Sequence, residues 1–170
     1  MTLKLPTPVN RALTMLRTAG FEAYVVGGCV RDSLLHKTPA DWDVTTSAKP
    51  EQILEVFSFE RTIPTGLEHG TVTVLLEGEP IEITTYRIDG AYTDHRHPDA
   101  VTFTASLQED LRRRDFTINA LAYSPEEGLV DICSGAADLE SHRIVCVGDP
   151  ETRFTEDALR ILRALRFSAV

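Results

Sequence analysis

Apolar residues along the chain follow two spacings, one typical of helices and one typical of strands. Val9, Leu13 and Leu16 recur at helical spacing, which predicts a helix over residues 8–19 that Gly20 ends. Shorter runs of apolar or alternating residues predict strands instead. The expected helices cover residues 8–19, 30–36, 50–57, 106–111 and 117–123, and the expected strands cover 21–26, 42–46, 59–63, 70–76, 80–87 and 129–132.

Two further segments depart from these periods. Residues 88–101 combine glycine, proline and charged residues without an apolar face, so we expect a mobile polar loop there. Thr155 is a residue type that caps a helix N-terminus, and Glu156 and Asp157 follow in a favourable acidic first turn. Because no glycine, asparagine or proline ends this last helix before Val170, we expect the chain to be a fragment of a longer protein.

The composition is typical of a folded globular protein without a membrane segment. The 170 residues, 42% of them hydrophobic, are enough for one domain or for one domain and the start of another. No run approaches the ~20 apolar residues that cross a bilayer, and the N-terminus lacks the apolar run of a signal peptide, so we expect a cytoplasmic protein. The three cysteines are scattered and suggest neither disulfides nor a zinc site. The net charge of −9 argues against this segment clamping a long nucleic acid by itself.

Asp41 and Asp43 are the first candidates for chemistry. Alternate residues of a strand share a face, so the two carboxylates are expected to point into one space, where a divalent cation would relieve their repulsion. Magnesium prefers such oxygen ligands and also takes substrate phosphates. Glu82, in the alternating strand 80–87, is the candidate for a third acidic ligand. The alternatives are a solvated turn for the aspartate pair and an exposed polar position for Glu82.

A pair of glycines precedes the aspartates by about one strand–helix–strand unit. Without a Cβ, Gly27 and Gly28 let the backbone approach a ligand closely, and the N–H groups that open the following helix attract anions. Arg31 and Asp32 complete the glycine-led segment. A phosphate cradle followed by a metal pair predicts phosphoryl transfer from a nucleotide, with two metal ions acting on the attacking hydroxyl and on the leaving pyrophosphate.

Two more polar clusters lie further along the chain. Arg113, Arg114 and Asp115 adjoin an apolar segment, as the wall of a pocket would; guanidinium groups can neutralise a triphosphate, and a fixed carboxylate can accept a ribose hydroxyl. The alternative is a charged helix surface. Asp157 and Arg160 are three residues apart, hence neighbours on one helix face, and are either an ordinary ion pair or a reader of base edges.

The base-edge interpretation of Asp157 and Arg160 rests on hydrogen-bond complementarity. Cytosine and adenine each present an exocyclic amine beside an unprotonated ring nitrogen, which matches a carboxylate acceptor next to a guanidinium donor. Guanine and uracil present the reverse order. Because mismatched buried polar groups cost ~1–3 kcal/mol each, one such pair can select C and A over G and U without a nucleic-acid template.

Taken together, these segments resemble the class II tRNA nucleotidyltransferases, the CCA-adding enzymes, and the related bacterial poly(A) polymerases. The resemblance runs from about Phe21 to the end of the chain. Its main blocks are VVGGCVRD at 25–32, DWDVTT at 41–46, LRRRDFTINA at 111–120 and EDALR at 156–160.

The resemblance implies an α+β fold, a polymerase-β-like nucleotidyltransferase head with a mixed β-sheet and flanking helices, followed by the start of a helical neck. The implied head covers residues 1–135, and the implied neck segment, which carries nucleobase recognition, covers 136–170. Two Mg²⁺ ions would lie on Asp41 and Asp43. The implied nucleotide-binding residues are Gly27, Gly28, Arg31, Asp32, Arg114, Asp115 and Asn119, together with Asp157 and Arg160 at the base and Glu156 orienting Arg160.

The implied activity is template-independent addition of C and A to the tRNA 3′ end from CTP and ATP. The segment 87–101 is similar to the flexible element that helps such enzymes change from C to A addition, which favours a CCA- or A-adding activity. Binding of tRNA is expected mainly through domains beyond this chain, and no membrane partner is expected. The alternatives are an A-adding enzyme, a poly(A) polymerase and a nucleotide-binding module without catalysis.

Overall fold

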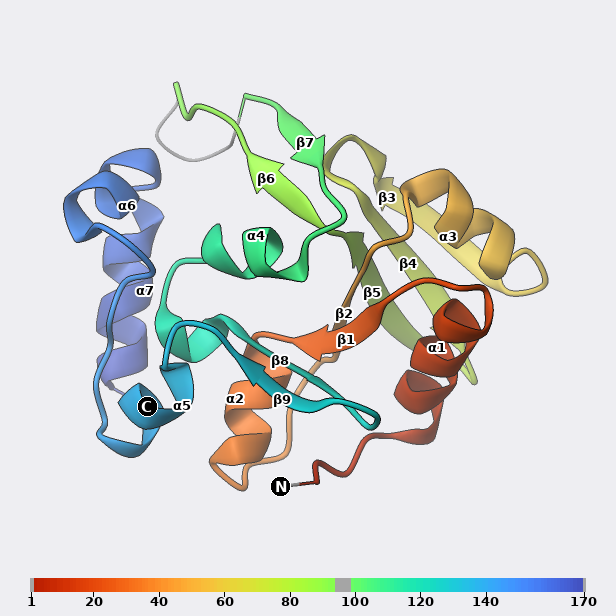
Figure 1. Cartoon of the computed structure of the whole chain (residues 1–170), viewed down its shortest axis with the longest axis horizontal. Coiled ribbons are helices and arrows are strands. Elements are labelled where there is room, and N and C mark those ends of the chain that lie inside the picture. Colours follow the sequence, from red (N-terminus) through yellow and green to blue (C-terminus); the bar gives the residue numbers. More distant parts are fainter. Residues whose placement is uncertain (1, 94–98, 170) are drawn as a thin grey trace.

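A mixed sheet forms the centre of the computed structural model, which describes residues 2–93 and 99–169 (Figure 1). Its strand order is β3-β4-β5-β2-β1-β8-β9. Only β2 and β5 pair in parallel; the other neighbouring strands of this described sheet are antiparallel. The strands are β1 (Ala23–Val26), β2 (Asp43–Thr46), β3 (Arg61–Gly66), β4 (Thr71–Leu76), β5 (Glu79–Thr85), β8 (Leu121–Ser124) and β9 (Gly128–Asp131).

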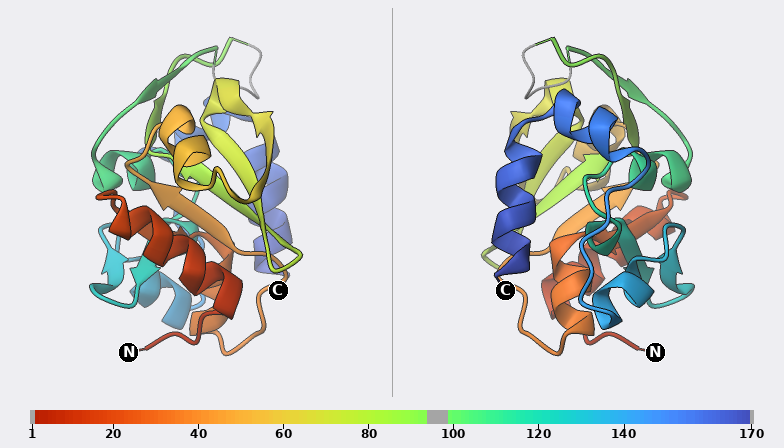
Figure 2. Two further views of the ribbon diagram at one scale, coloured as in Figure 1. Left: turned by 90° about the vertical axis from the view of Figure 1, so that its right-hand side faces the viewer. Right: turned by 90° about the vertical axis from the view of Figure 1, so that its left-hand side faces the viewer.

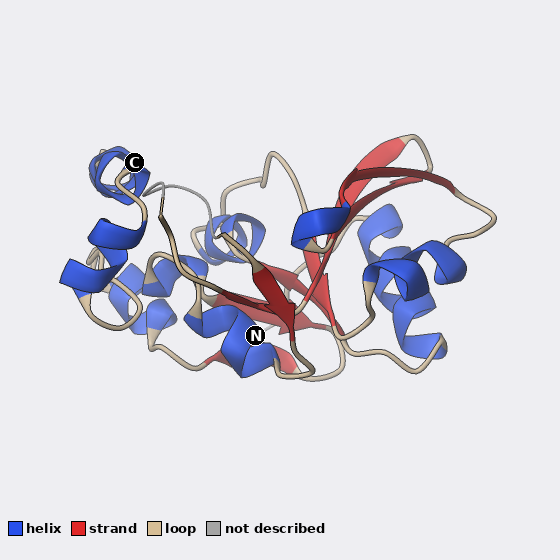
Figure 3. Ribbon diagram, turned by 90° about the horizontal axis from the view of Figure 1, so that it is seen from above, coloured by secondary structure: helices blue, strands red, loops and turns tan. Residues whose placement is uncertain are grey.

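Both faces of the sheet are covered, because the side chains of its central strands alternate between two apolar clusters. Ala23 and Val25 of β1 join the larger cluster, which also contains apolar residues of the helices α1 (Thr7–Thr18), α2 (Gly28–Leu34) and α3 (Pro50–Val56). Tyr24 and Val26 join the smaller cluster with Leu111 of α4 (Leu107–Arg112) on the other face. The view from above shows the twisted sheet with helices flanking it (Figure 3).

The polar segment after β5 is more ordered at its ends than the sequence suggests. β6 (Arg87–Asp89) and β7 (Val101–Phe103) form a two-stranded antiparallel sheet. Beyond it, the Gly90 N–H donates to the Ala100 carbonyl at 2.8 Å. The expectation of a loop from 88 to 101 is therefore wrong at both ends, while residues 94–98, where much of its polar character lies, are outside the described part of the chain.

The C-terminal part of the chain is helical and lies to one side of the sheet (Figures 1 and 2). It contains α5 (Gly135–Glu140), α6 (Pro150–Glu156) and α7 (Leu159–Ser168), and two short 3₁₀ turns occur earlier, η1 (Leu67–His69) and η2 (Thr117–Asn119). At Gly135, an added Cβ would lie 2.0 Å from the Thr117 carbonyl oxygen, so only glycine allows α5 to pack this closely on η2. The boundary expected at residue 135 stays a prediction.

Two further expectations about secondary structure are wrong. The helix expected over 117–123 is a 3₁₀ turn followed by β8, because an apolar run that is buried on both faces has the same sequence character in a helix and in a central strand. Thr155 does not cap a helix: Asp149 caps α6 by accepting from Thr152 N–H at 2.8 Å, and a break at Asp157 separates α6 from α7. Across the residues that the structure describes, no helix is long and apolar enough to cross a membrane.

Candidate functional site

Three carboxylates gather where β2 and β5 run side by side. Asp43 is the first residue of β2, and Glu82 of β5 is its partner in the parallel register. Asp41 lies in the loop two residues before β2, so strand alternation does not place it. Removal of water by surrounding protein, and then the charges of Glu82 and Asp41, raise the pKa of Asp43 to about 6, against an opposing effect of Arg114. The carboxylates therefore repel one another at this position.

This donor set fits a cation that is shared with a substrate. In the described ranges, no three His, Cys, Asp or Glu side chains are arranged so that they alone could hold a metal ion. Magnesium is usually bound through one or two carboxylates together with substrate phosphates and water, so a complete protein cage is not required. The raised pKa of Asp43 is the signature of a negative charge that a cation would stabilise.

The glycine turn lies next to an arginine. Gly27 has φ +79° and is the N-cap of α2, a backbone conformation that residues with a side chain rarely adopt. A Cβ at Gly27 would lie 3.1 Å from Nη1 of Arg114. The same arginine acts on the charge of Asp43. Arg114 therefore joins the glycine turn to the carboxylates.

A line of hydrogen bonds connects α2 to α7 through the segment around η2. Arg31 pairs with Asp32 at 2.7 Å between Nη2 and Oδ1, and its Nη1 donates to Oδ1 of Asn119 at 2.6 Å. Asn119 Nδ2 donates to Oδ1 of Asp115 at 3.1 Å. Arg163 of α7 donates from Nε to Oδ2 of Asp115 at 2.6 Å. Four of the expected nucleotide-binding residues thus form one connected set.

A cavity of about 580 Å³ collects most of the remaining candidates. Its wall includes Arg114, Asp115, Asp157, Arg160, Arg163 and Tyr92. The two glycines, Asp41, Asp43 and Glu82 lie outside this wall. The expected site is therefore divided into a carboxylate side and a cavity side, with Arg114 adjacent to both.

Asp157 and Arg160 reach this cavity by a different route from the one expected. They do not share a helix face, because Asp157 is extended between α6 and α7 and its Oδ1 accepts from Leu159 N–H at 2.9 Å. Arg160 is 6% exposed, and its Nη1 donates to Glu156 Oε2 at 2.7 Å. Burial alone lowers the pKa of Arg160, but the hydrogen bond to Glu156 and the charges of Tyr92, Glu156 and Asp157 together outweigh it, and the resulting pKa is above its usual range. The guanidinium is thus a fixed cation at the cavity wall.

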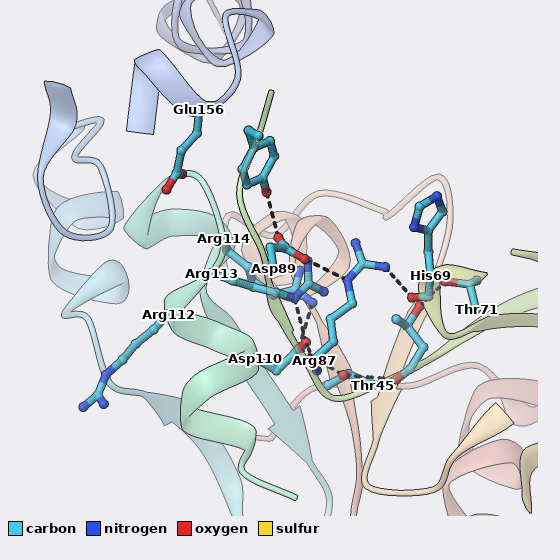
Figure 4. A network of polar contacts seen from close by, with 12 residues as sticks. Thr45, His69, Thr71, Arg87, Asp89, Asp110, Arg112, Arg113, Arg114 and Glu156 are labelled. Atoms are coloured by element: carbon cyan, nitrogen blue, oxygen red, sulfur yellow. Dashed lines mark hydrogen bonds and ion pairs between the residues drawn. The ribbon is translucent and has the colours of Figure 1, made fainter. Parts of the chain in front are cut away.

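Sequence reasoning missed two residues that hold these arginines. Asp110 of α4 is completely buried and pairs with Arg113 and Arg114, while Arg112 points away (Figure 4). Tyr92 lies 3.4 Å from Arg160 through its hydroxyl, with its ring 5.6 Å from the guanidinium carbon. The spacing of Asp110 to Arg113 and Arg114, three and four residues in a helix, is a signal that could have identified it. Nothing comparable marks Tyr92.

Comparison with known proteins identifies the family. Residues 23–145 match the family described as the poly A polymerase head domain. The chain belongs to this family. The match includes the glycine turn, the carboxylates and Asp115, and ends before α6 and α7.

Curated proteins that are similar to this chain are named as CCA-adding enzymes. The one from Lactobacillus helveticus is 54% identical over 169 residues, covering 98% of this chain and 42% of the relative. The one from Oceanobacillus iheyensis is 55% identical over 157 residues, covering 92% of this chain and 39% of the relative. The chain therefore spans about two fifths of the length of these relatives.

Solved structures confirm the predicted fold. The Bacillus stearothermophilus CCA-adding enzyme in complex with CTP matches with a TM-score of 0.86 and 41% identity, over 96% of this chain and 39% of that chain. The Thermotoga maritima CCA-adding enzyme complexed with tRNA(CCA) matches with a TM-score of 0.74 and 28% identity, over 94% and 36%. The mixed sheet with flanking helices is thus the poly A polymerase head fold.

Proposed function

We propose that this chain is the catalytic head, with the start of the neck, of a protein that adds C and A to the 3′ end of tRNA from CTP and ATP. The names of the relatives support this activity, and the complexes with CTP and tRNA support its substrates. The neck is taken to begin near residue 136, and the reaction is taken to occur in the cytoplasm. Binding of tRNA is proposed to rest mainly on segments outside the part that this chain shares with its longer relatives, of which it spans about two fifths.

The position of Arg114 is the observation that carries the proposal. Its guanidinium lies against Gly27, acts on Asp43, and also lines the cavity with Asp157 and Arg160. A nucleoside triphosphate can therefore extend from the carboxylate side, at its phosphates, to the cavity side, at its base.

Asp41 and Asp43 would hold Mg²⁺, with Glu82 as a further acidic group beside Asp43. Two Mg²⁺ ions, when bound, supply activation of the RNA 3′-hydroxyl and charge neutralisation at the leaving pyrophosphate. The protein contributes the carboxylates and an adjacent cation, Arg114, which limits the negative charge around the triphosphate. Gly27, with its neighbour Gly28, leaves space for phosphate oxygens near the backbone.

The remaining expected residues have distinct proposed roles. Arg31 and Asp32 shape the turn on the triphosphate side, and Asn119 fixes Arg31 by accepting from its Nη1. Asp115 would accept a ribose hydroxyl. Because its Oδ1 already accepts from Phe116 N–H and Asn119, the hydroxyl would share Oδ2 with Arg163.

Base selection is assigned to Asp157 and Arg160. Asp157 supplies the acceptor and Arg160 the donor for the base edge, while Glu156 fixes the guanidinium from behind. This order of acceptor and donor fits cytosine and adenine and places like groups against guanine and uracil. The Asp157 carboxylate accepts from Leu159 N–H at the start of α7, which holds it in place for such contacts.

Extension assays with the complete protein test the proposal. On a tRNA that ends at its discriminator base, we expect CTP incorporation followed by ATP incorporation. ATP incorporation that requires a tRNA ending in CC would indicate an A-adding enzyme, and long A tails would indicate a poly(A) polymerase. Asp41→Ala should abolish turnover while retaining part of the nucleotide binding. A wild-type protein that binds nucleotide without turnover would be a binding module and would contradict the proposal.

A further inference from the structure

Asp110 is a buried charge whose presence the fold alone does not explain. It is 0% exposed and lies outside the wall of the cavity. It is not the cap of α4, because Ser106 is the N-cap residue and accepts from Glu109 N–H. A carboxylate is expensive to bury, and replacing a buried ion pair by apolar residues is often neutral or stabilising. A requirement other than stability therefore accounts better for an aspartate at this position.

Four groups from three separate segments converge on this carboxylate (Figure 4). Arg113 Nε donates to Oδ1 at 2.9 Å, and Arg114 Nη2 donates to Oδ2 at 3.4 Å. Thr45 Oγ1 of β2 donates to Oδ2 at 3.1 Å, and Arg87 N–H of β6 donates to Oδ1 at 3.3 Å. Burial alone would raise the pKa of Asp110, but these arginines lower it below its usual range, so the group is ionised. It is a full negative charge at the junction of β2, β6 and α4.

Arg114 depends on Asp110 for charge compensation more than Arg113 does. In the part of the chain that the structure describes, Asp110 is the sole ion-pair partner of Arg114, whereas Arg113 also pairs with Asp89 at 3.7 Å. The Nε of Arg114 is buried and has no hydrogen-bond partner among the described residues. Two adjacent guanidinium groups repel each other, and Asp110 is the charge that keeps both in place.

The ion pair with Asp110 also determines where the other guanidinium nitrogens of Arg114 lie. With Nη2 on Asp110, Nη1 lies against the Gly27 turn, and the guanidinium is close enough to Asp43 to lower its pKa. Thr45, which shares the carboxylate, is two residues after Asp43 on the same face of β2. Asp110 thus fixes Arg114 and the strand of Asp43 relative to each other.

We propose that Asp110 is a positioning residue for nucleotide binding, which acts by holding Arg114 between the glycine turn and the carboxylates. The inference rests on the proposed function, because it assigns Arg114 to the nucleotide. It predicts an effect on the binding of every nucleotide, since the triphosphate is common to them, and no effect on the choice between bases, which lies with Asp157 and Arg160.

The first test measures KM, kcat and melting temperature of the complete protein carrying Asp110→Asn. We expect the KM for CTP and the KM for ATP to rise by the same factor, about tenfold, with a smaller change in kcat and unchanged discrimination against UTP. Asp138→Asn is the matched control, because Asp138 is also buried and also pairs with a threonine, Thr117, and an arginine, Arg143. A loss of melting temperature in both variants, with neither KM changed, would mean that Asp110 is only structural and would overturn the proposal.

A double-mutant cycle identifies the residue through which Asp110 acts. In an Arg114→Ala background, Asp110→Asn should change KM by less than about twofold, because the arginine that it positions is gone. Arg112→Ala is the control background, since Arg112 is exposed and points away from Asp110, and there the tenfold effect should persist. A full effect of Asp110→Asn without Arg114 would contradict the proposed route.

Two further measurements keep the result interpretable. If Asp110→Asn does not fold, Asp110→Glu retains the charge while displacing the carboxylate by one methylene, and it should also raise both KM values. A folded Asp110→Glu protein with wild-type KM values would overturn the proposal. Turnover of the wild-type protein is measured in parallel: its absence would refute the proposed function, whereas normal turnover with unaffected Asp110 variants refutes this inference alone.

Discussion

The two sides of the candidate site differ in how their charges are compensated. On the carboxylate side, Asp43 lies between Glu82 and Asp41, and its pKa of about 6 reflects a charge that the protein leaves incompletely neutralised. On the cavity side, Arg160 is buried and already bonded to Glu156, to the Arg153 carbonyl and to Tyr92. The carboxylate side is arranged to gain a cation, whereas Arg160 on the cavity side already has hydrogen-bond partners within the protein.

This difference assigns catalysis and selection to separate groups. Charges that repel in the free protein favour ligands that neutralise them, so the carboxylate side should control whether turnover occurs. Groups that are already fixed lose little freedom on binding, and they discriminate because a wrong partner leaves them unpaired. Substitutions on the carboxylate side should therefore change the turnover rate, and substitutions on the cavity side should change the choice of nucleotide.

The largest expected effect is loss of turnover in Asp43→Asn. The substitution keeps the shape of the side chain but removes the charge that would hold Mg²⁺, so we expect kcat to fall by roughly a thousandfold, which corresponds to about 4 kcal/mol of activation free energy. Nucleotide binding should be partly retained. Single-turnover incorporation of CTP by the complete protein measures the effect.

Glu79→Gln is the control for Asp43→Asn. Glu79 lies at the exposed start of β5, the strand that also carries Glu82, and it should leave kcat unchanged. Glu82→Gln should fall between the two variants if its carboxylate takes part with that of Asp43. Wild-type turnover in Asp43→Asn would remove the basis for a catalytic carboxylate side.

The next effect is a relaxed choice of nucleotide in Arg160→Ala. Removing the guanidinium deletes the donor that guanine and uracil cannot match, so incorporation of UTP and GTP relative to CTP and ATP should rise by roughly 5- to 150-fold, from a mismatch cost of ~1–3 kcal/mol. Competition assays with pairs of nucleotides measure the ratio. Turnover with CTP should fall much less than in Asp43→Asn.

Arg166→Ala provides the matched control on the same helix. Arg166 is exposed on α7 and should leave the ratio unchanged. Glu156→Gln should relax the ratio to a smaller extent, because Arg160 keeps its contacts with the Arg153 carbonyl and Tyr92. Equal selectivity in Arg160→Ala and in the wild type would contradict the role given to the cavity side.

The affinity of the carboxylate side for Mg²⁺ should depend on pH. Because the pKa of Asp43 is about 6, a proton competes with the cation below that pH, and the half-saturating Mg²⁺ concentration should rise by about tenfold per pH unit. Above pH 7 it should level off. Isothermal titration with Mg²⁺ and a non-hydrolysable nucleotide measures it, and a flat response between pH 5 and 7 would contradict the assignment.

Much of the fold follows from the sequence because its central elements have clear signals. Gly20 ends α1 and the apolar spacing of that helix predicts its buried face. The segment at 117–123 was not predictable in the same way, since only pairing with β1 and β9 makes it a strand. The break at Asp157 was also hidden, because Glu156 and Asp157 have the character of a favourable acidic first turn, whereas the structure places Glu156 at the end of α6 and Asp157 in an extended conformation.

The candidate site was predictable as a set of residues but not as an arrangement. Sequence blocks brought Arg31, Asn119 and Asp115 together, and the structure links them by hydrogen bonds. The pairing of Glu156 with Arg160 was expected, but Asp110 was overlooked although its helical spacing to Arg114 is a local signal. Tyr92 was not foreseen, because its contact with Arg160 depends on tertiary folding. Side chains that position others carry weaker sequence signals than those that meet the ligand.

The smallest expected effect is a gain in stability of Asp43→Asn in the absence of Mg²⁺. It tests whether the charge of Asp43 is incompletely neutralised within the protein. A folded-state pKa above the unfolded value of ~3.9 means that the native protein binds the proton more tightly, so the contribution of Asp43 to stability is lost as pH rises from about 4 to 6. At pH 7 the asparagine variant should melt a few degrees higher, equivalent to less than about 1 kcal/mol after solvent screening. The difference should vanish near pH 4, and saturating Mg²⁺ should stabilise the wild type more than the variant. An asparagine variant that melts lower at pH 7 without Mg²⁺ would show that the carboxylate is already compensated within the protein, and the contrast between the two sides would be lost.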